Sequence, residues 1–208
     1  MTREKTKKIN KLSLYYGKNY FDSNNIKELI EIIGWRSKDR ELVLEAGCGR
    51  GEISLALSRF TGLICMGVDI RPVRFLWGLK RLNEETSQRI FFIHTSIFGL
   101  SLKLPFKFDR VFLPFPDPYP RRKHSKKRLT SPYGLLNLWK ASSPSNTFYL
   151  ITDNYHNYRF TLEVLKETCS FSLHSHGPTS TITPFDEYHF ILMNTPTKYR
   201  EKYACLLY

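Results

Sequence analysis

Two short stretches of this chain combine residue types found in binding and catalytic sites, and the first suits a nucleoside ligand. Positions 45–51 read E-A-G-C-G-R-G, so that Glu45 precedes three alternating glycines, Gly47, Gly49 and Gly51. Alternating glycines let a turn bend tightly and bring the backbone close to a ligand. Asp69 ends the next apolar run, where a carboxylate can accept both hydroxyls of a ribose. The spacing is neither the G-x-G-x-x-G of dinucleotide folds nor a P-loop. The carboxylate of Glu45 would suit the cationic sulfonium of S-adenosylmethionine, so these residues together predict that cofactor.

The second stretch joins a carboxylate to a cluster of positive charge. Asp117 lies in P-F-P-D-P-Y-P at 114–120, where four prolines stiffen the backbone and fix the direction of the acid. Six of the eight residues at 121–128 are Lys or Arg. Such a run predicts contacts with phosphates, which add salt-dependent affinity and little sequence information.

The elements that must position these residues follow from the apolar pattern. Strands are expected at 41–45, 63–68, 90–93, 110–113 and 147–151. Helices are expected from 26 to Gly34 with Asp22 or Ser23 as the cap, and at 52–60, 73–84, 133–140 and 156–167. From Phe171 onward the pattern indicates antiparallel strands. The alternation predicts an α/β fold with a mostly parallel sheet and helices on both faces.

Composition bounds the protein class. The 208 residues carry 32 basic and 19 acidic side chains, a formal charge of +13, which favours nucleic acid as a partner and an anionic membrane surface second. We expect a basic arm over 1–20 and a single domain over 21–208. No apolar run is long enough to span a membrane, and the four cysteines show no C-x-x-C pair. The expectation is a reduced cytoplasmic protein without a metal, a monomer or weak homodimer.

One family resemblance covers residues 42–203. The sequence F-P-D-P-Y-P-R-R-K-H-S-K-K-R-L from Phe115 resembles the F-P-D-P-W-P-K-[KR]-R-H-x-K-R-R signature of bacterial tRNA (guanine-N7-)-methyltransferases. The segments E-A-G-C-G-R-G-E, G-V-D-I-R, I-T-D-N-Y-H-N-Y and T-K-Y-R-E-K-Y agree in the same order. The resemblance implies a Rossmann-like class I methyltransferase fold, with a mostly parallel seven-stranded sheet and an antiparallel C-terminal hairpin. It also implies S-adenosylmethionine as donor and N7 of a guanine in the tRNA variable loop as acceptor.

The resemblance also assigns site residues by position. Asp117 resembles the active-site acid, which also lines the cofactor, and Glu45 and Asp69 resemble cofactor acids, while Ser96 stands where the family has a third acid. The substrate-binding positions correspond to Arg121, Asp153, Thr197, Lys198, Tyr199, Arg200 and Glu201, with Arg200 at the usual Glu. The positions expected to meet RNA phosphate are Arg122, Lys123, His124, Lys126, Lys127 and Arg128.

Methyl transfer to N7 requires orientation of the guanine more than it requires a base. N7 of guanine has a lone pair and no proton, so Asp117 is expected to orient the purine and stabilise its developing positive charge. Tyr119 could stack on a flipped base or serve packing, and Asp153 could bind guanine or cap the helix after it.

Two other functions stay open at this point. A non-catalytic RNA-binding protein that keeps the cofactor pocket is favoured by the acids missing at Ser96 and Arg200. An exocyclic-amine methyltransferase is suggested by Asp117-Pro118-Tyr119, which lacks the second proline of [DN]-P-P-[YW].

Overall fold

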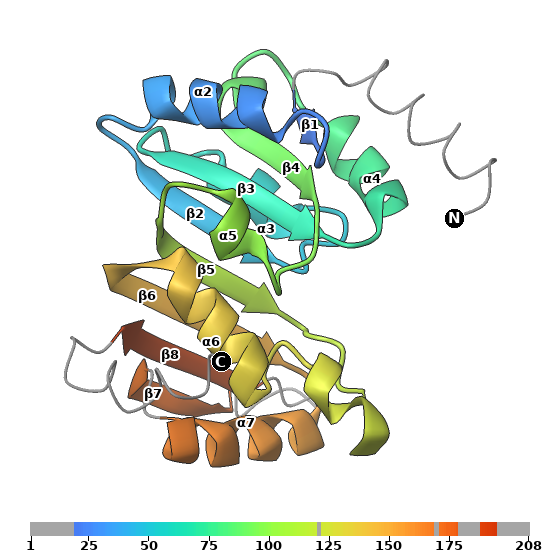
Figure 1. The fold of residues 1–208 in the computed structure, drawn as a ribbon, viewed down its shortest axis with the longest axis vertical. Helices are drawn as coiled ribbons and strands as arrows, with labels where there is room; N and C mark the ends of the chain where they lie inside the picture. Colours follow the sequence, from blue (N-terminus) through green and yellow to red (C-terminus); the bar gives the residue numbers. More distant parts are fainter. Residues whose placement is uncertain (1–18, 120–121, 169–170, 179–187, 195–208) are drawn as a thin grey trace. The chain divides into compact units, whose positions relative to one another are not determined.

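The computed structural model describes residues 19–119, 122–168, 171–178 and 188–194 (Figure 1). It divides into two compact units, Met1–Pro105 and Phe106–Tyr208. Each unit is an α/β assembly of its own strands and helices.

The first unit contains four parallel strands in the order β1-β4-β3-β2. They are β1 Tyr20–Phe21, β4 Ile90–His94, β3 Leu63–Asp69 and β2 Glu41–Ala46. Its helices are α2 Ile26–Arg36, α3 Glu52–Leu57, α4 Phe75–Leu79 and α5 Leu100–Lys103, with short 3-10 turns at Pro72–Arg74 and Thr86–Gln88. The strands are almost fully buried apolar runs, as expected where helices cover both faces of a parallel sheet.

The second unit mixes parallel and antiparallel pairs. Strand β5 Phe108–Pro114 runs parallel to β6 Ser142–Thr152, and β8 Tyr188–Asn194 pairs antiparallel with both β6 and β7 Phe171–Pro178. Its helices are α6 Pro132–Ala141 and α7 Tyr155–Thr168, preceded by the 3-10 helix η3 Arg122–Lys127. The antiparallel C-terminal strands confirm the sequence prediction.

Large aromatic side chains fill the core of the first unit. Phe75 stacks on Phe92 with ring centroids 5.4 Å apart, and Tyr20 contacts Phe75 at 6.0 Å. Tyr20 is fully buried although it lies at the end of the predicted arm, whose residues 1–18 lie outside the described part of the chain. In the described part of the chain, the two-residue strand β1 is an addition to the seven longer strands.

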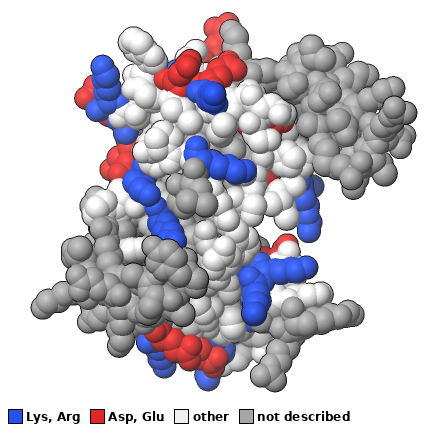
Figure 2. Space-filling view, in the orientation of Figure 1, with Lys and Arg blue, Asp and Glu red and all other residues white. Residues whose placement is uncertain are grey.

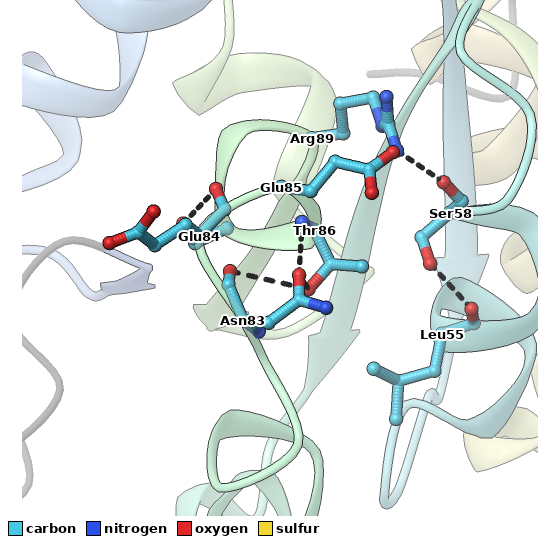
Figure 3. Close-up of polar contacts among 8 residues, drawn as sticks. Leu55, Ser58, Asn83, Glu84, Glu85, Thr86 and Arg89 are labelled. Carbon is cyan, nitrogen blue, oxygen red and sulfur yellow. Dashed lines mark hydrogen bonds and ion pairs between the residues drawn. The ribbon is translucent and has the colours of Figure 1, made fainter.

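A buried arginine braces the same unit at the start of β4. Arg89 is 7% exposed and donates through Nη2 to the backbone oxygen of Ser58 at 2.8 Å and to Glu85 at 2.8 Å (Figure 3). Ser58 in turn donates to the backbone oxygen of Leu55. This chain of contacts ties the end of α3 to the strand that carries Phe92.

Several predicted element boundaries are wrong. Helix α2 begins after Asn25, so neither Asp22 nor Ser23 caps it, and it runs through Gly34 to Arg36 because an exposed glycine weakens a helix without ending it. The helix expected at 73–84 is a 3-10 turn followed by five α-helical residues, and α3 ends at Leu57. Strand β6 starts at Ser142, five residues before the expected start.

None of the helices in the described part of the chain is long and apolar enough to cross a membrane.

Candidate functional site

The glycine turn after β2 has the tight geometry that its sequence predicts. Gly47, Gly49 and Gly51 all have left-handed φ values, of 71°, 53° and 75°. The turn is fastened to β3, because the backbone nitrogens of Gly47 and Cys48 both donate to the Val68 oxygen, at 2.8 and 3.1 Å. At Gly51 a Cβ would lie 2.5 Å from Cζ of Phe92, so packing as well as φ requires glycine there.

Asp69 fixes the shape of this turn from the end of β3. Its side chain is 7% exposed, and its Oδ2 accepts from the Gly49 nitrogen at 3.0 Å while Oδ1 accepts from the Arg71 nitrogen at 2.8 Å. A carboxylate offers about four lone-pair positions. Both oxygens can therefore accept a further bond from a hydroxyl of a ligand lying over the turn.

Glu45 lies deeper and links β2 to α3. It is 2% exposed, and its Oε2 accepts from the Ser54 nitrogen at 2.8 Å and the Ser54 Oγ at 2.5 Å. Gly51, the N-cap of α3, has no side chain, so Glu45 takes the place of a local cap. Burial raises the pKa of Glu45 to about 7, against the opposing effect of the hydrogen bonds from Ser54. A cationic group nearby would favour its charged form.

Two hydroxyl residues, Thr95 and Ser96, follow the end of β4. Ser96 is exposed and its Oγ accepts from the Phe98 nitrogen at 3.2 Å. The neighbouring Thr95 is buried, and its Oγ1 accepts from Lys103 Nζ at 2.7 Å. The Lys103 contact is not detectable in the sequence, because nothing in the local pattern distinguishes this lysine from a solvated one.

In the second unit, the segment 115–119 presents Asp117 beyond the end of β5. Asp117 is exposed, and two residues around it, Phe115 and Tyr119, have left-handed φ values of 46° and 39°. Such values are uncommon for residues other than glycine and mark a strained backbone. The Phe115 nitrogen donates to the Ile151 oxygen at 2.8 Å, which fastens the segment to β6.

Asp153 follows the end of β6, the neighbouring parallel strand. In the register of this pair Pro114 lies opposite Ile151, so Asp117 and Asp153 follow strand ends at one edge of the sheet. Asp153 is exposed, and the expected alternative that it caps α7 is wrong. Asn154 caps this helix, because its Oδ1 accepts from the Asn157 nitrogen at 2.9 Å. An Asn directly before a helical pattern is a cap signal that the sequence offered.

Residues Arg122–Lys127 of the basic run form a 3-10 helix, and the described side chains of the run face different surroundings. Lys126 and Lys127 are exposed, whereas the His124 ring meets the edge of Tyr119 with centroids 6.3 Å apart. Arg128 lies over the Phe160 ring of α7 and donates to the Tyr119 oxygen. Arg122 and Lys123 lie in the same 3-10 helix. Figure 2 shows Lys and Arg in several groups separated by uncharged surface on the displayed face.

The remaining predicted positions lie outside the described residues. They are Arg121, Thr197, Lys198, Tyr199, Arg200 and Glu201. Among the residues that the structure describes, no group of three or more His, Cys, Asp or Glu side chains is placed to hold a metal ion.

Curated relatives carry one name in common. A tRNA (guanine-N(7)-)-methyltransferase of Mycoplasma genitalium is 26% identical over 168 residues, which cover 79% of this chain and 78% of that protein. The protein of the same name from Mycoplasma capricolum is 29% identical, over 77% of this chain and 74% of its own.

Solved structures agree on the fold. A mutant of the 16S rRNA (adenine(1408)-N(1))-methyltransferase of Catenulisporales acidiphilia matches with a TM-score of 0.64 at 10% identity and covers 81% of this chain and 92% of its own. The magnesium protoporphyrin IX methyltransferase of Synechocystis, with bound SAM, matches with a TM-score of 0.53 at 17% identity, over 83% and 79%. These likenesses confirm the predicted α/β methyltransferase fold. Residues 39–204 also match the family described as "Putative methyltransferase" (Methyltransf_4), and the chain belongs to that family.

Proposed function

We propose that this protein transfers a methyl group from S-adenosylmethionine to N7 of a guanine in tRNA. The observation that carries the proposal is the pair of exposed carboxylates, Asp117 and Asp153, at the ends of neighbouring parallel strands, with the basic run following the first of them. The curated relatives bear the name of this reaction over about four fifths of the chain, and the family is one of methyltransferases.

The first unit supplies residues that fit the cofactor. The left-handed turn has three positions without a Cβ atom, and Asp69 at the end of the next strand can accept ribose hydroxyls. Glu45 beneath the turn suits a cationic ligand group, because such a group stabilises a buried carboxylate. When bound, S-adenosylmethionine would supply an electrophilic methyl group on its sulfonium. In place of the family's third acid, Ser96 would offer only a hydroxyl.

The second unit supplies residues that fit the acceptor. Asp117 would orient the guanine and stabilise the positive charge that the purine gains, since a fixed carboxylate lowers the energy of that charge in the transition state. Asp153 would accept from the N1 and N2 donors of guanine. Because N7 carries no proton, neither acid needs to act as a base.

The basic helix supplies the contacts with the RNA backbone. Lys126 and Lys127 are exposed and would meet phosphates, and the resemblance extends this role to Arg122, Lys123 and His124 and gives Arg121 to the substrate. The resemblance also assigns the C-terminal motif Thr197, Lys198, Tyr199, Arg200 and Glu201 to substrate binding. Binding should therefore weaken steeply with added salt. We expect a monomer or weak homodimer that acts in the cytoplasm, where tRNA is found.

The test is incubation of the full chain with unmodified tRNA and S-adenosylmethionine labelled in its methyl group, followed by nucleoside analysis. The expected product is 7-methylguanosine. A labelled N6-methyladenosine or N4-methylcytidine would replace the proposal with the exocyclic-amine alternative. Tight cofactor binding without any methylated nucleoside would support the RNA-binding alternative.

A further inference from the structure

Arg128, the last residue of the basic run, is surrounded differently from the lysines before it. Lys126 and Lys127 are exposed, but the guanidinium of Arg128 lies over the Phe160 ring, with Cζ 4.2 Å from the ring centroid. Its Nη2 donates to the Tyr119 oxygen at 3.1 Å. Its Nε is buried and finds no hydrogen-bond partner among the described residues. One face and one donor of this cation are therefore already used inside the protein.

The group that Arg128 holds is the far end of the segment that carries Asp117. Tyr119, with φ of 39°, is one of two strained non-glycine residues here, and the other is Phe115, with φ of 46°. A strained backbone persists only where its surroundings fix it. The Phe115 end is fixed by its bond to Ile151, and the Tyr119 end is fixed by Arg128. Asp117 lies between these two attachments.

The backbone around Arg128 is itself firmly held. Its oxygen accepts from the Ser131 nitrogen at 3.1 Å, and a Cβ on Gly134 of α6 would lie 2.7 Å from the same oxygen. Two residues on, the buried Thr130 donates to Asn157 Oδ1 of α7 at 3.0 Å. The anchor that Arg128 offers to Tyr119 is thus fastened to both helices of the unit.

We propose that Arg128 is a positioning residue, which holds the Asp117 segment against α7, in place of the phosphate contact that the sequence predicts. The inference rests on the proposed function for its effect on catalysis. An arginine suits this place because its planar guanidinium can stack on a ring and donate in its plane at once. A lysine keeps the charge but offers no plane, so charge alone would not replace it.

Hydrogen exchange on the full chain tests the structural part without any activity. The amide of Phe115 is the informative one, because it donates to the Ile151 oxygen at the other end of the segment, and the prolines at 114, 116, 118 and 120 carry no amide hydrogen. In Arg128→Met this amide should exchange at least about tenfold faster than in the wild type, because loss of the Tyr119 attachment frees the far end of the segment and makes opening at Phe115 more frequent. Lys127→Ala is the matched control, which removes a cation one residue away without touching Tyr119. Unchanged exchange in Arg128→Met overturns the proposal.

Kinetics with tRNA then separate positioning from phosphate binding. Arg128→Met and Arg128→Lys should both lower kcat at least about tenfold while the salt dependence of tRNA binding keeps its slope. Lys127→Ala should instead raise the KM for tRNA and reduce that slope by about one. A reduced slope with unchanged kcat in Arg128→Met would make Arg128 a phosphate contact and overturn the proposal.

A second variant covers the case in which Arg128→Met does not fold. Phe160→Leu removes the stacking face and leaves the cation, and should reproduce the faster exchange at Phe115 to a smaller extent. Exchange at wild-type rates in Phe160→Leu would count against the proposal. If the wild type methylates no tRNA, the proposed function fails, while the exchange data still decide whether Arg128 holds the segment.

Discussion

The glycine turn after β2 and the proline segment after β5 both follow a parallel strand, yet the carboxylates around them are held in opposite ways. Glu45 and Asp69 are buried, and each accepts backbone N–H groups of the turn or of the helix after it. Asp117 and Asp153 are exposed beyond their strands. The first region bends through glycines, and the second bends through two strained residues with side chains.

The difference shows that an acidic residue can either organise the backbone of a site or be exposed on its surface. A buried carboxylate must have its oxygens satisfied, so it organises the backbone around it. The oxygens of an exposed carboxylate can also be satisfied by water, and here prolines stiffen the segment that carries Asp117.

Gly51→Ala should break the first region. The added Cβ would collide with the Phe92 ring and force a side chain into a left-handed φ, at a combined cost of about 3 kcal/mol of unfolding free energy. Urea unfolding measures this. Gly34→Ala is the matched control, because a Cβ there meets nothing within 4 Å, and it should add up to about 1 kcal/mol in the helix. A Gly51→Ala protein as stable as the wild type would refute the argument from packing.

Asp117→Asn should break the second region without unfolding it. The side chain is exposed and Asn has nearly the same size as Asp, so the protein should still fold as the wild type does. Loss of the charge should lower the methylation rate about 100-fold, as for removal of one electrostatic contact to a transition state. Single-turnover measurements with tRNA give this rate. Activity within a few-fold of the wild type would disprove the charge role.

Glu45→Gln should change how the free energy of unfolding depends on pH. The pKa of Glu45 is raised from 4.5 to about 7 in the folded protein, so between these values the folded state holds a proton that the unfolded state has released. Stability from this group is complete below the unfolded pKa and falls as pH rises toward 7. The wild type should lose about 2 kcal/mol between pH 5 and pH 7.5 relative to the variant. Stability curves that run parallel for the two proteins would contradict the shift.

Asn154→Ala should give the smallest effect and tests the cap of α7. This helix starts with a local side-chain cap, whereas α3 is capped by Glu45 of strand β2. Loss of the cap should cost about 1 kcal/mol in thermal or urea unfolding. Asn154→Ser keeps a capping oxygen and should restore most of it. A larger loss of stability in Asp153→Ala than in Asn154→Ala would show that Asp153 caps the helix.

Local sequence patterns predicted most of the architecture. The buried strands, the glycine turn and the antiparallel C-terminal strands each depend on a pattern within a few consecutive residues. Their existence could therefore be predicted from the sequence. Boundaries failed where one residue was given too much weight, as at Gly34, or where a sequence can form either a 3-10 turn or an α-helix, as at Pro72–Arg74. The exposure of Asp117 and Asp153 also follows from their places just beyond strand ends.

Local sequence was enough to identify the residues at the ends of the strands: the acids, the glycines, the prolines and the cations. What several of them do depends on contacts made in the folded chain. Glu45 caps a helix through Ser54, nine residues away, and Arg128 reaches back nine residues to Tyr119 and across to Phe160. The physical reason is that a hydrogen bond or a stacked ring depends on distances of a few ångström between elements, and no local propensity encodes those distances.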